Sequence, residues 1–127
     1  MSKERFTSSV QKVLQESHSL ALRYDHQFIE GAHLLFSLMS DADSSVVSLL
    51  REAKVNVEDL KSALAQLLEK MPKVVQGDGN IHFSSECFRL FNLAEKAAQV
   101  RGDQYISTEM LLLSLLQERG VTGELLK

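Results

Sequence analysis

The chain has 127 residues, of which 44% are hydrophobic and 24% are charged, with a formal net charge of −3, and this length predicts one domain over residues 1–127. The negative charge excludes the basic field that attracts nucleic acid or anionic lipid, and no apolar run approaches the ~18 residues of a membrane span. A single cysteine, Cys87, excludes an internal disulfide and, with no signal-peptide-like apolar region near Met1, predicts a soluble cytoplasmic protein.

Apolar residues recur at helical spacing through the first part of the chain, and no long alternating run predicts a strand. A first helix is expected at residues 7–24, with Thr7 as its N-cap. Its buried face consists of small and apolar residues: Val10, Val13, Leu14, Ser17 and Ala21. Three more helices are expected: one from Gly31 through Leu34, Leu35 and Leu38, one at residues 44–52, and one from the cap Asn56 to residue 70.

A break in the helical pattern follows at residues 71–82. This stretch holds the only proline of the chain, Pro72, and two glycines, so it is expected to be a linker. The helical pattern then resumes with a fifth helix capped by Ser84. Phe83 and Phe88 flank that cap at the spacing of a hydrophobic staple, which predicts a contact between the two rings.

The end of the chain predicts two further helices. Ser107 can cap a sixth helix, and Glu109 lies in its first turn, where the helix dipole favours an anion. A seventh helix is expected to include Leu125 and Leu126. These elements complete a chain in which every regular element is predicted to be helical.

One stretch of sequence occurs twice. Residues 26–39 read HQFIEGAHLLFSLM and residues 103–116 read DQYISTEMLLLSLL, with six identities in fourteen positions. The same register keeps one face of the first and fifth helices apolar or small, as it pairs Phe6 with Phe83, Val10 with Cys87, Val13 with Leu90, Leu14 with Phe91, Ser17 with Ala94 and Ala21 with Ala98. The sequence therefore predicts an all-α fold of two tandem, pseudo-twofold copies of a four-helix unit.

The register also sets the bounds of the two copies. The first copy is expected at residues 1–70 and the second at residues 83–127. Carried forward, the fourth helix of the second copy would begin where the sequence ends at Lys127. We therefore expect the last helix of the second repeat to be missing and the chain to be a piece of a longer protein.

Signatures of catalysis and of cofactor binding are absent from the sequence. It contains no G-x-x-x-x-G-K-[ST], no G-x-S-x-G and no H-E-x-x-H motif, so this piece is predicted to be a binding domain rather than an enzyme. Glu30 and His33 have the i, i+3 spacing of helical di-metal sites. The second copy has Ser107 and Met110 there instead, so His33 is expected to be structural and Cys87 a small core residue.

The fifth helix has more apolar residues than its core face requires. Leu93, Ala97 and Val100, named here the apolar flank, occupy positions where the first copy has Glu16, Leu20 and Arg23. Met110 replaces His33, and from that pairing it is expected to be partly exposed. Leu93, Ala97 and Met110 are therefore predicted to form a groove for extended hydrophobic segments. The alternative is that the flank packs against the other copy.

Three polar residues edge this predicted groove. Thr7, Asp103 and Glu109 each have a local structural role available, as N-cap, loop acceptor and helix-dipole partner. Those roles suffice to explain their presence from the residues alone.

The two repeated stretches, QFIEGAHLLFSLM and GDQYISTEMLLLSLL, resemble sequences of the Clp N-terminal domain (Clp repeat) family. Within it the chain is most similar to ClpB-type disaggregases, on the stretches SLALRYDHQFIEGAHLL, MPKVVQGDGN and LAEKAAQVRGDQYIS. It departs from the family pattern at Gly31, where a residue favouring a helix start is expected, and at Met110.

The resemblance implies a stress-response chaperone module at the front of a homohexameric AAA+ ATPase. Such modules bind unfolded or aggregated proteins, or adaptor proteins, for delivery to the ATPase ring. The isolated domain is expected to be a monomer without a cofactor, while ATP and Mg²⁺ are expected in the downstream ATPase domains. The resemblance also implies that Thr7, Asp103 and Glu109 border the partner-binding surface.

Three alternatives remain open at this point. Within the family, the chain could be the adaptor-docking N-domain of a Clp protease unfoldase, although the sequence of the linker, MPKVVQGDGN, argues against it. Outside the family, it could be a free-standing helical metalloprotein that uses Glu30, His33 and Glu109. It could also be a purely structural spacer, which would not bind unfolded chains.

Overall fold

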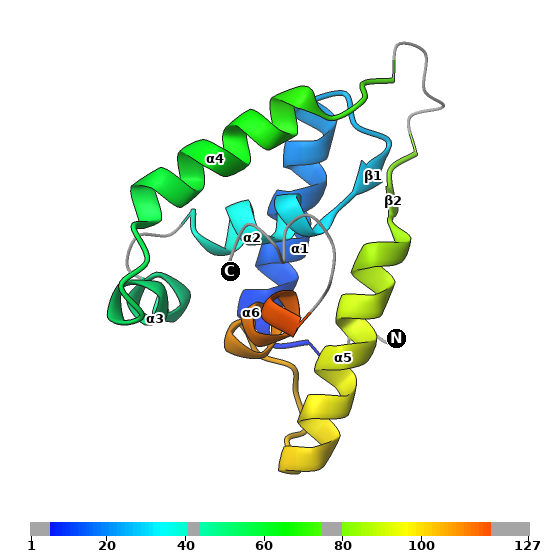
Figure 1. Ribbon diagram of the computed structural model, residues 1–127. Coiled ribbons are helices and arrows are strands. Elements are labelled where there is room, and N and C mark those ends of the chain that lie inside the picture. Colours follow the sequence, from blue (N-terminus) through cyan, green and yellow to red (C-terminus); the bar gives the residue numbers. More distant parts are fainter. Residues whose placement is uncertain (1–5, 41–43, 75–79, 118–127) are drawn as a thin grey trace.

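The computed structural model describes residues 6–40, 44–74 and 80–117. In these ranges the elements are α1 (Ser8–Arg23), β1 (Phe28–Ile29), α2 (Gly31–Leu38), α3 (Ser45–Glu52), α4 (Val57–Lys70), β2 (His82–Phe83), α5 (Ser85–Arg101) and α6 (Thr108–Gln117) (Figure 1). The predicted helical class is confirmed, and no helix in these ranges is long and apolar enough to cross a membrane. The predicted helix at Leu125 and Leu126 lies outside the described residues.

Side-chain caps start the helices where the sequence predicts them. Thr7 Oγ1 accepts the N–H of Val10 at 3.2 Å, and the same i, i+3 bond recurs at Ser44, Asn56, Ser84 and Ser107 with distances of 3.0–3.3 Å. Each cap satisfies an N–H group that has no partner within its own helix. The predicted staple is also confirmed, since the rings of Phe83 and Phe88 lie 6.5 Å apart between centroids.

Helix α2 begins in a different way, and this explains Gly31. The N–H of Glu30 donates to Nδ1 of His33 at 2.8 Å, and the N–H of Gly31 donates to Oε1 of Glu86 at 2.7 Å. A Cβ atom at position 31 would lie 3.0 Å from that carboxylate oxygen. Glycine therefore occupies the start of α2 because a carboxylate from α5 approaches the backbone there closely.

Two crossed backbone pairings join the copies. Strands β1 and β2 pair in parallel, with Ile29 opposite Phe83, and an isolated parallel bridge joins Phe6 to Ile106. The repeat register maps each pairing onto the other, because Phe6 matches Phe83 and Ile29 matches Ile106. The hydrogen bonds agree: the N–H of Ser84 donates to the Ile29 carbonyl at 3.0 Å, and that of Thr7 donates to the Ile106 carbonyl at 3.1 Å. The predicted pseudo-twofold repeat is thereby confirmed.

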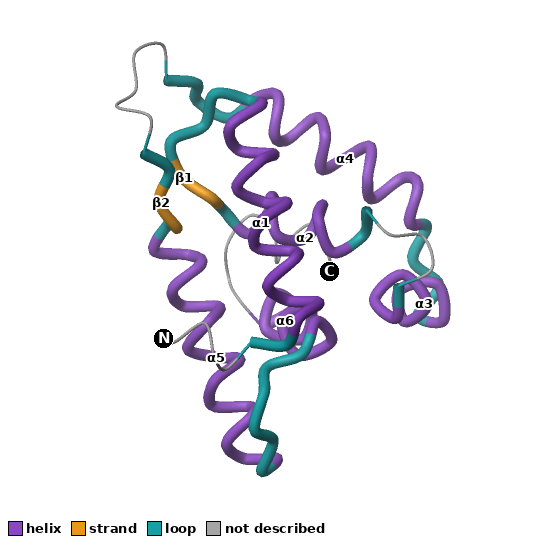
Figure 2. Tube along the Cα trace, turned by 180° about the vertical axis from the view of Figure 1, so that it is seen from behind, coloured by secondary structure: helices purple, strands orange, loops and turns teal. Residues whose placement is uncertain are grey.

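The two repeated helices lie at the centre of the molecule. Helices α2 and α6 pack together, α1 packs on α2, α5 packs on α6, and α4 lies across α2 (Figures 1 and 2). Leu34 and Leu35 of α2, with Leu111 and Leu115 of α6, are almost fully buried. Helices that are apolar on most sides require such central positions, and the outer helices α1 and α5 keep their polar faces toward solvent.

Candidate functional site

The polar residues predicted at the edge of the groove lie around the starts of α1 and α6. Thr7 caps α1 and also binds the Ile106 carbonyl, which places it beside the loop that leads into α6. Asp103 lies in that loop, where its Oδ2 is 3.4 Å from Nε of Arg101. The predicted N-cap role of Thr7 is therefore confirmed, whereas the interaction of the Asp103 side chain seen here is an ion pair at the end of α5.

Glu109 connects α6 to α3. It lies in the first turn of α6, and its carboxylate accepts a hydrogen bond from the Ser45 hydroxyl at the start of α3. This bond lowers the pKa of the Glu109 carboxyl below its usual range, against the effect of partial burial. The residue is half-buried and anionic, so it can still present negative charge beside the loop that contains Asp103.

The residues predicted to form an apolar groove are not equally accessible. Leu93 and Ala97 are half-buried, and Val100 is 87% exposed. Met110 is only 3% exposed and belongs to the core, so its predicted place in the groove is wrong. The exposed apolar residues of α6 are instead Leu113 and Leu116.

The reason for the error lies in the matching residue of the first copy. Met110 was expected at the surface because its counterpart, His33, is polar. His33 is itself fully buried, because Glu30 and His26 satisfy both of its ring nitrogens. A polar residue in one copy therefore does not show that the matching position of the other copy is exposed.

A second apolar surface escaped the sequence analysis. A hollow of about 360 Å³ lies where α1, β2 and α5 meet, with Phe83, Phe88 and Phe91 along one side. The ring of Phe91 lies 5.6 Å from Phe6, 5.2 Å from Phe83 and 6.4 Å from Phe88 between centroids. The close spacing of Phe83, Phe88 and Phe91 is the sequence signal for this cluster. The spacing of Phe83 and Phe88 alone predicts only a hydrophobic staple.

A pair of histidines is buried beside the start of α2. Nδ1 of His26 and Nε2 of His33 lie 2.8 Å apart. Because Nδ1 of His33 accepts the Glu30 N–H, the His33 proton is on Nε2 and donates to His26. Burial, together with the neighbouring His26, lowers the pKa of His33 to about 4. Burial also lowers the pKa of His26, and the Leu68 carbonyl partly opposes this.

These histidines have a structural role. The expectation of a structural His33 is borne out by its burial and by its two ring partners. Within residues 6–40, 44–74 and 80–117, no group of three or more His, Cys, Asp or Glu side chains could hold a metal ion. The metalloprotein alternative, with Glu30, His33 and Glu109, therefore gains no support from the part of the chain that is described.

Cys87 also belongs to the core, as expected. It is fully buried, and its Sγ donates to the Ile29 carbonyl at 2.9 Å. Burial raises the pKa of its thiol to about 12. A thiol that stays protonated in an apolar setting is a poor nucleophile, so its chemistry is that of a small core residue.

Two crossed copies of one helical unit, with caps and core in register, define a tandem-repeat helical domain. The chain belongs to the Clp repeat (R) N-terminal domain family, whose model matches residues 5–127. The chaperone protein ClpB of Vibrio cholerae is 42% identical over 124 residues, which cover 98% of this chain and 14% of that protein. The ClpB of Pseudomonas putida is 35% identical over 123 residues, with 97% and 14% coverage. The chain thus spans about one seventh of these relatives.

Solved structures share the fold at lower sequence identity. The Hsp104 N-terminal domain from Candida albicans matches with a TM-score of 0.85 and 20% identity, over 94% of this chain and 78% of that one. A complex of the ClpV N-domain with a VipB peptide matches with a TM-score of 0.77 and 17% identity, over 94% and 74% of the two chains. The chain therefore shares its fold with the Hsp104 and ClpV N-domains, and the ClpV N-domain is solved in complex with a peptide.

Proposed function

We propose that this chain is the substrate-binding N-terminal domain of a ClpB-type AAA+ protein disaggregase, and that it weakly binds hydrophobic segments of unfolded or aggregated proteins. The apolar flank of α5 carries the proposal. Its residues are half-buried or exposed, and the first copy builds the same fold with Glu16 and Arg23 at two of the three matching positions. The fold therefore does not require apolar residues at the positions of Leu93 and Val100, which supports a binding role for them, whereas Ala97 also packs against the core.

The position of Met110 in the core changes the proposed groove. Leu93 and Ala97 of α5 remain in it, and Leu113 of α6, which is 48% exposed, replaces Met110. The matching residues of the first copy, Glu16, Leu20 and Phe36, all line one hollow, which supports placing their counterparts on one surface. The existence of a peptide complex for the ClpV N-domain, which has the same fold, supports a peptide as the ligand.

The polar edge of the groove sets a preference among segments. Asp103 and Glu109 are carboxylates beside the start of α6, and Thr7, whose hydroxyl caps α1, lies next to them. We expect this edge to favour apolar segments flanked by Lys or Arg, because complementary charge speeds encounter and disfavours wrong partners.

The proposed function requires only weak binding. A module that releases its cargo to a motor needs micromolar or weaker contacts, on the order of −8 kcal/mol or less favourable. A few apolar side chains at roughly 1.5–3 kcal/mol each supply this after ordering costs. In a homohexamer, several copies would act together by avidity.

The longer protein supplies the rest of the proposed activity. We propose that it is a cytoplasmic ATPase whose other domains bind ATP and Mg²⁺, and that this domain binds protein without catalysing a reaction. Isolated, the domain is proposed to be a monomer. Adaptor proteins are the second proposed class of partner.

The test is an NMR titration of the domain with a permanently unfolded protein. Leu93→Ser and Val100→Ser should each weaken capture, by roughly fivefold for a loss of about 1 kcal/mol, with an unchanged helical circular dichroism spectrum. Leu22→Ser is the matched control, because Leu22 is a 59% exposed leucine on α1, away from the flank. It should change the affinity by less than about twofold.

Several results would contradict the proposal. Signal changes confined to α2, α3 and α4 would place the binding surface elsewhere. If Leu93→Ser unfolded the domain and the Val100→Ser variant bound unfolded protein as tightly as the unaltered domain, the flank would be a packing surface and not a binding surface. Saturable binding of a folded adaptor without binding of unfolded chains would favour the adaptor-docking role, and no binding at all would favour a structural spacer.

A further inference from the structure

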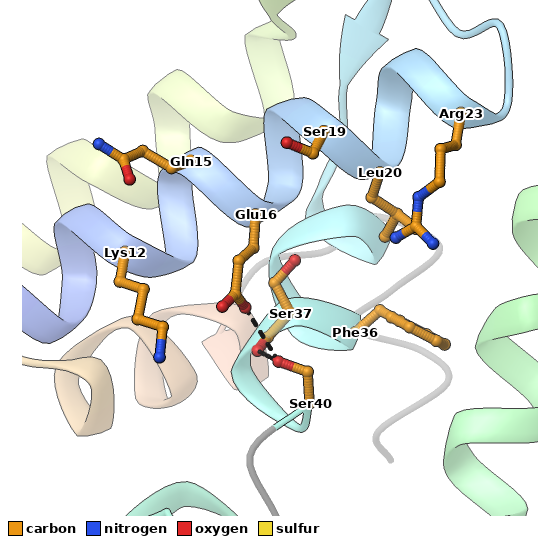
Figure 3. A pocket seen from close by; sticks show the side chains of 9 residues that line it. All are labelled: Lys12, Gln15, Glu16, Ser19, Leu20, Arg23, Phe36, Ser37 and Ser40. Carbon is orange, nitrogen blue, oxygen red and sulfur yellow. Dashed lines mark hydrogen bonds between the residues drawn. The ribbon is translucent and has the colours of Figure 1, made fainter.

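A second hollow lies on the first copy, between the exposed face of α1 and the end of α2 (Figure 3). It has a volume of about 590 Å³. Leu20 and Ser37 are buried at its base, and Phe36 is half-buried beside them. Near Lys12, the Ser40 hydroxyl lies 2.9 Å from Oε2 of Glu16 and 2.8 Å from the Ser37 carbonyl. The remaining lining residues are Gln15, Ser19 and Arg23.

Cations surround the apolar part of this hollow. Lys12 and Arg23 lie at its two ends in Figure 3, and neither makes an ion pair with another residue of the described ranges. From α4, Nζ of Lys61 lies 5.4 Å from the centroid of the Phe36 ring. Among the described residues that line this hollow, Lys12 and Arg23 are the cations and Glu16 is the one carboxylate, and Lys61 lies beside Phe36. This part of the rim is therefore positive on a chain whose net charge is −3.

The second copy has a different chemistry at the matching positions. The repeat register replaces Arg23 with Val100, Glu16 with Leu93 and Phe36 with Leu113. Arg89 matches Lys12 and Lys96 matches Ser19, so the second copy also has cations at matching positions. The two surfaces therefore differ in the place of their cations and in the carboxylate and aromatic ring that only the first copy has. The apolar flank suits a predominantly apolar segment, whereas the cation-edged hollow on the first copy suits a ligand that carries negative charge as well as an apolar group.

We propose that this hollow binds an acidic segment of a partner protein. An aromatic or aliphatic side chain of that segment contacts Leu20 and Phe36, and carboxylates on either side of it face Lys12 and Arg23. The two cations are eleven positions apart on α1, which is about 16 Å along a helix. An extended peptide covers that span in about five residues, so the carboxylates lie two or so positions on each side of the apolar residue.

The proposal is independent of the hydrophobic-segment binding assigned to the apolar flank. A single-stranded nucleic acid is the competing ligand, because a base could stack on Phe36 and phosphates could meet the cations. The structure favours the peptide. Lys61 already covers the Phe36 ring, and the carboxylate of Glu16 lies within the hollow, where it would repel a continuous phosphate backbone.

Fluorescence anisotropy of the whole chain with labelled peptides tests this. The probe peptide carries a central phenylalanine with glutamates on both sides. One control peptide has glutamines for the glutamates, and another has glycine for the phenylalanine. An oligouridine of similar length tests the nucleic acid. The glutamate–phenylalanine peptide should bind most tightly, and its affinity should fall as salt rises.

Charge-reversal variants locate the site. Lys12→Glu or Arg23→Glu should weaken the acidic peptide roughly fivefold, and Phe36→Leu, which installs the residue of the second copy, should weaken it as well. Lys96→Glu is the matched control, because Lys96 is exposed on α5 and the same change in net charge leaves the hollow intact.

Two sets of results would overturn the proposal. One is a loss of affinity with Lys96→Glu as large as that with Lys12→Glu, or binding of the glutamine peptide as tight as that of the glutamate peptide. Either result would show that the cations of the hollow do not recognise the peptide. The other is tighter binding of the oligouridine. Leu93→Ser should leave this peptide unaffected and Lys12→Glu should leave capture of uncharged apolar segments unaffected, so the two proposals fail separately.

Discussion

Replacement of His33 with methionine, the residue at the matching position of the second copy, is expected to make the stability of the domain less dependent on pH. In the folded protein the His33–His26 pair has no free acceptor for an extra proton. A proton on Nδ1 of His33 would face the Glu30 N–H, and one on Nδ1 of His26 would face the N–H of His33. Protonation must therefore break one of these two hydrogen bonds.

The sign and size follow from the pKa of His33. Its pKa is about 4 in the folded state, against 6.5 for an ordinary histidine, so the unfolded chain binds the proton first on acidification. The stability from this site is complete above pH 6.5 and falls as the pH falls toward 4. A shift of this size corresponds to a loss of about 3 kcal/mol. The pKa of His26 is lowered too, which adds a loss of the same sign.

Urea unfolding followed by circular dichroism, at several values between about pH 7.5 and pH 4.5, measures this effect. Near pH 7.5, His33→Met should cost about 2 kcal/mol, since it leaves the Glu30 N–H without its buried partner. Acidification to about pH 4.5 should change this difference by about 2.5 kcal/mol in favour of the variant, so the two proteins should become about equally stable. Carboxylates that titrate in both proteins cancel in this difference.

His18→Gln is the control, because His18 is exposed on α1 and lies outside the pair. Its stability curve should run parallel to that of the unaltered protein. A difference between the unaltered protein and His33→Met that stays constant across the pH range would refute the reasoning, because the histidine pair would then not be the acid-sensitive group.

Three further predictions concern the backbone and are checked by the free energy of unfolding in urea. Gly102→Ala should cost about 1 kcal/mol, because Gly102 ends α5 with φ +74° and an alanine is strained there; no loss would contradict the left-handed cap. Ser84→Ala should cost about 1–2 kcal/mol, because it removes a buried N-cap, and its test is a comparison with Ser85→Ala. Gly31→Ala should destabilise by about 1 kcal/mol despite better helix propensity, because its Cβ approaches the Glu86 carboxylate; a gain in stability would contradict that contact.

The helices were predictable because the signals that start them are local. An N-cap such as Ser84 and the apolar spacing after it lie within a few residues, and the structure reproduces both. The strands were not predictable in the same way. Each has only two residues, too few for an alternating pattern, and their pairing arises from the meeting of the two copies.

The candidate site was only partly predictable, because exposure depends on distant partners. Comparison of the copies predicted Leu93 and Ala97 to be in excess of the core; both are half-buried, but Ala97 packs against the core. The same comparison failed for Met110, because it treated the polarity of His33 as a sign of exposure. Only the three-dimensional arrangement shows that Nδ1 of His26 lies 2.8 Å from Nε2 of His33. This hydrogen bond satisfies the buried imidazole of His33 and so allows a polar residue in the core.

The crossed pairing of Phe6 with Ile106 and of Ile29 with Phe83 has the form of an isologous dimer interface. In such an interface residue i of one subunit contacts residue j of the other, and j in turn contacts i. A chain that carried only one copy could complete these contacts only by associating with a second such chain. A single repeat is therefore expected to fold as a homodimer whose stability depends on concentration, whereas tandem duplication makes the same interface intramolecular and frees folding from that dependence.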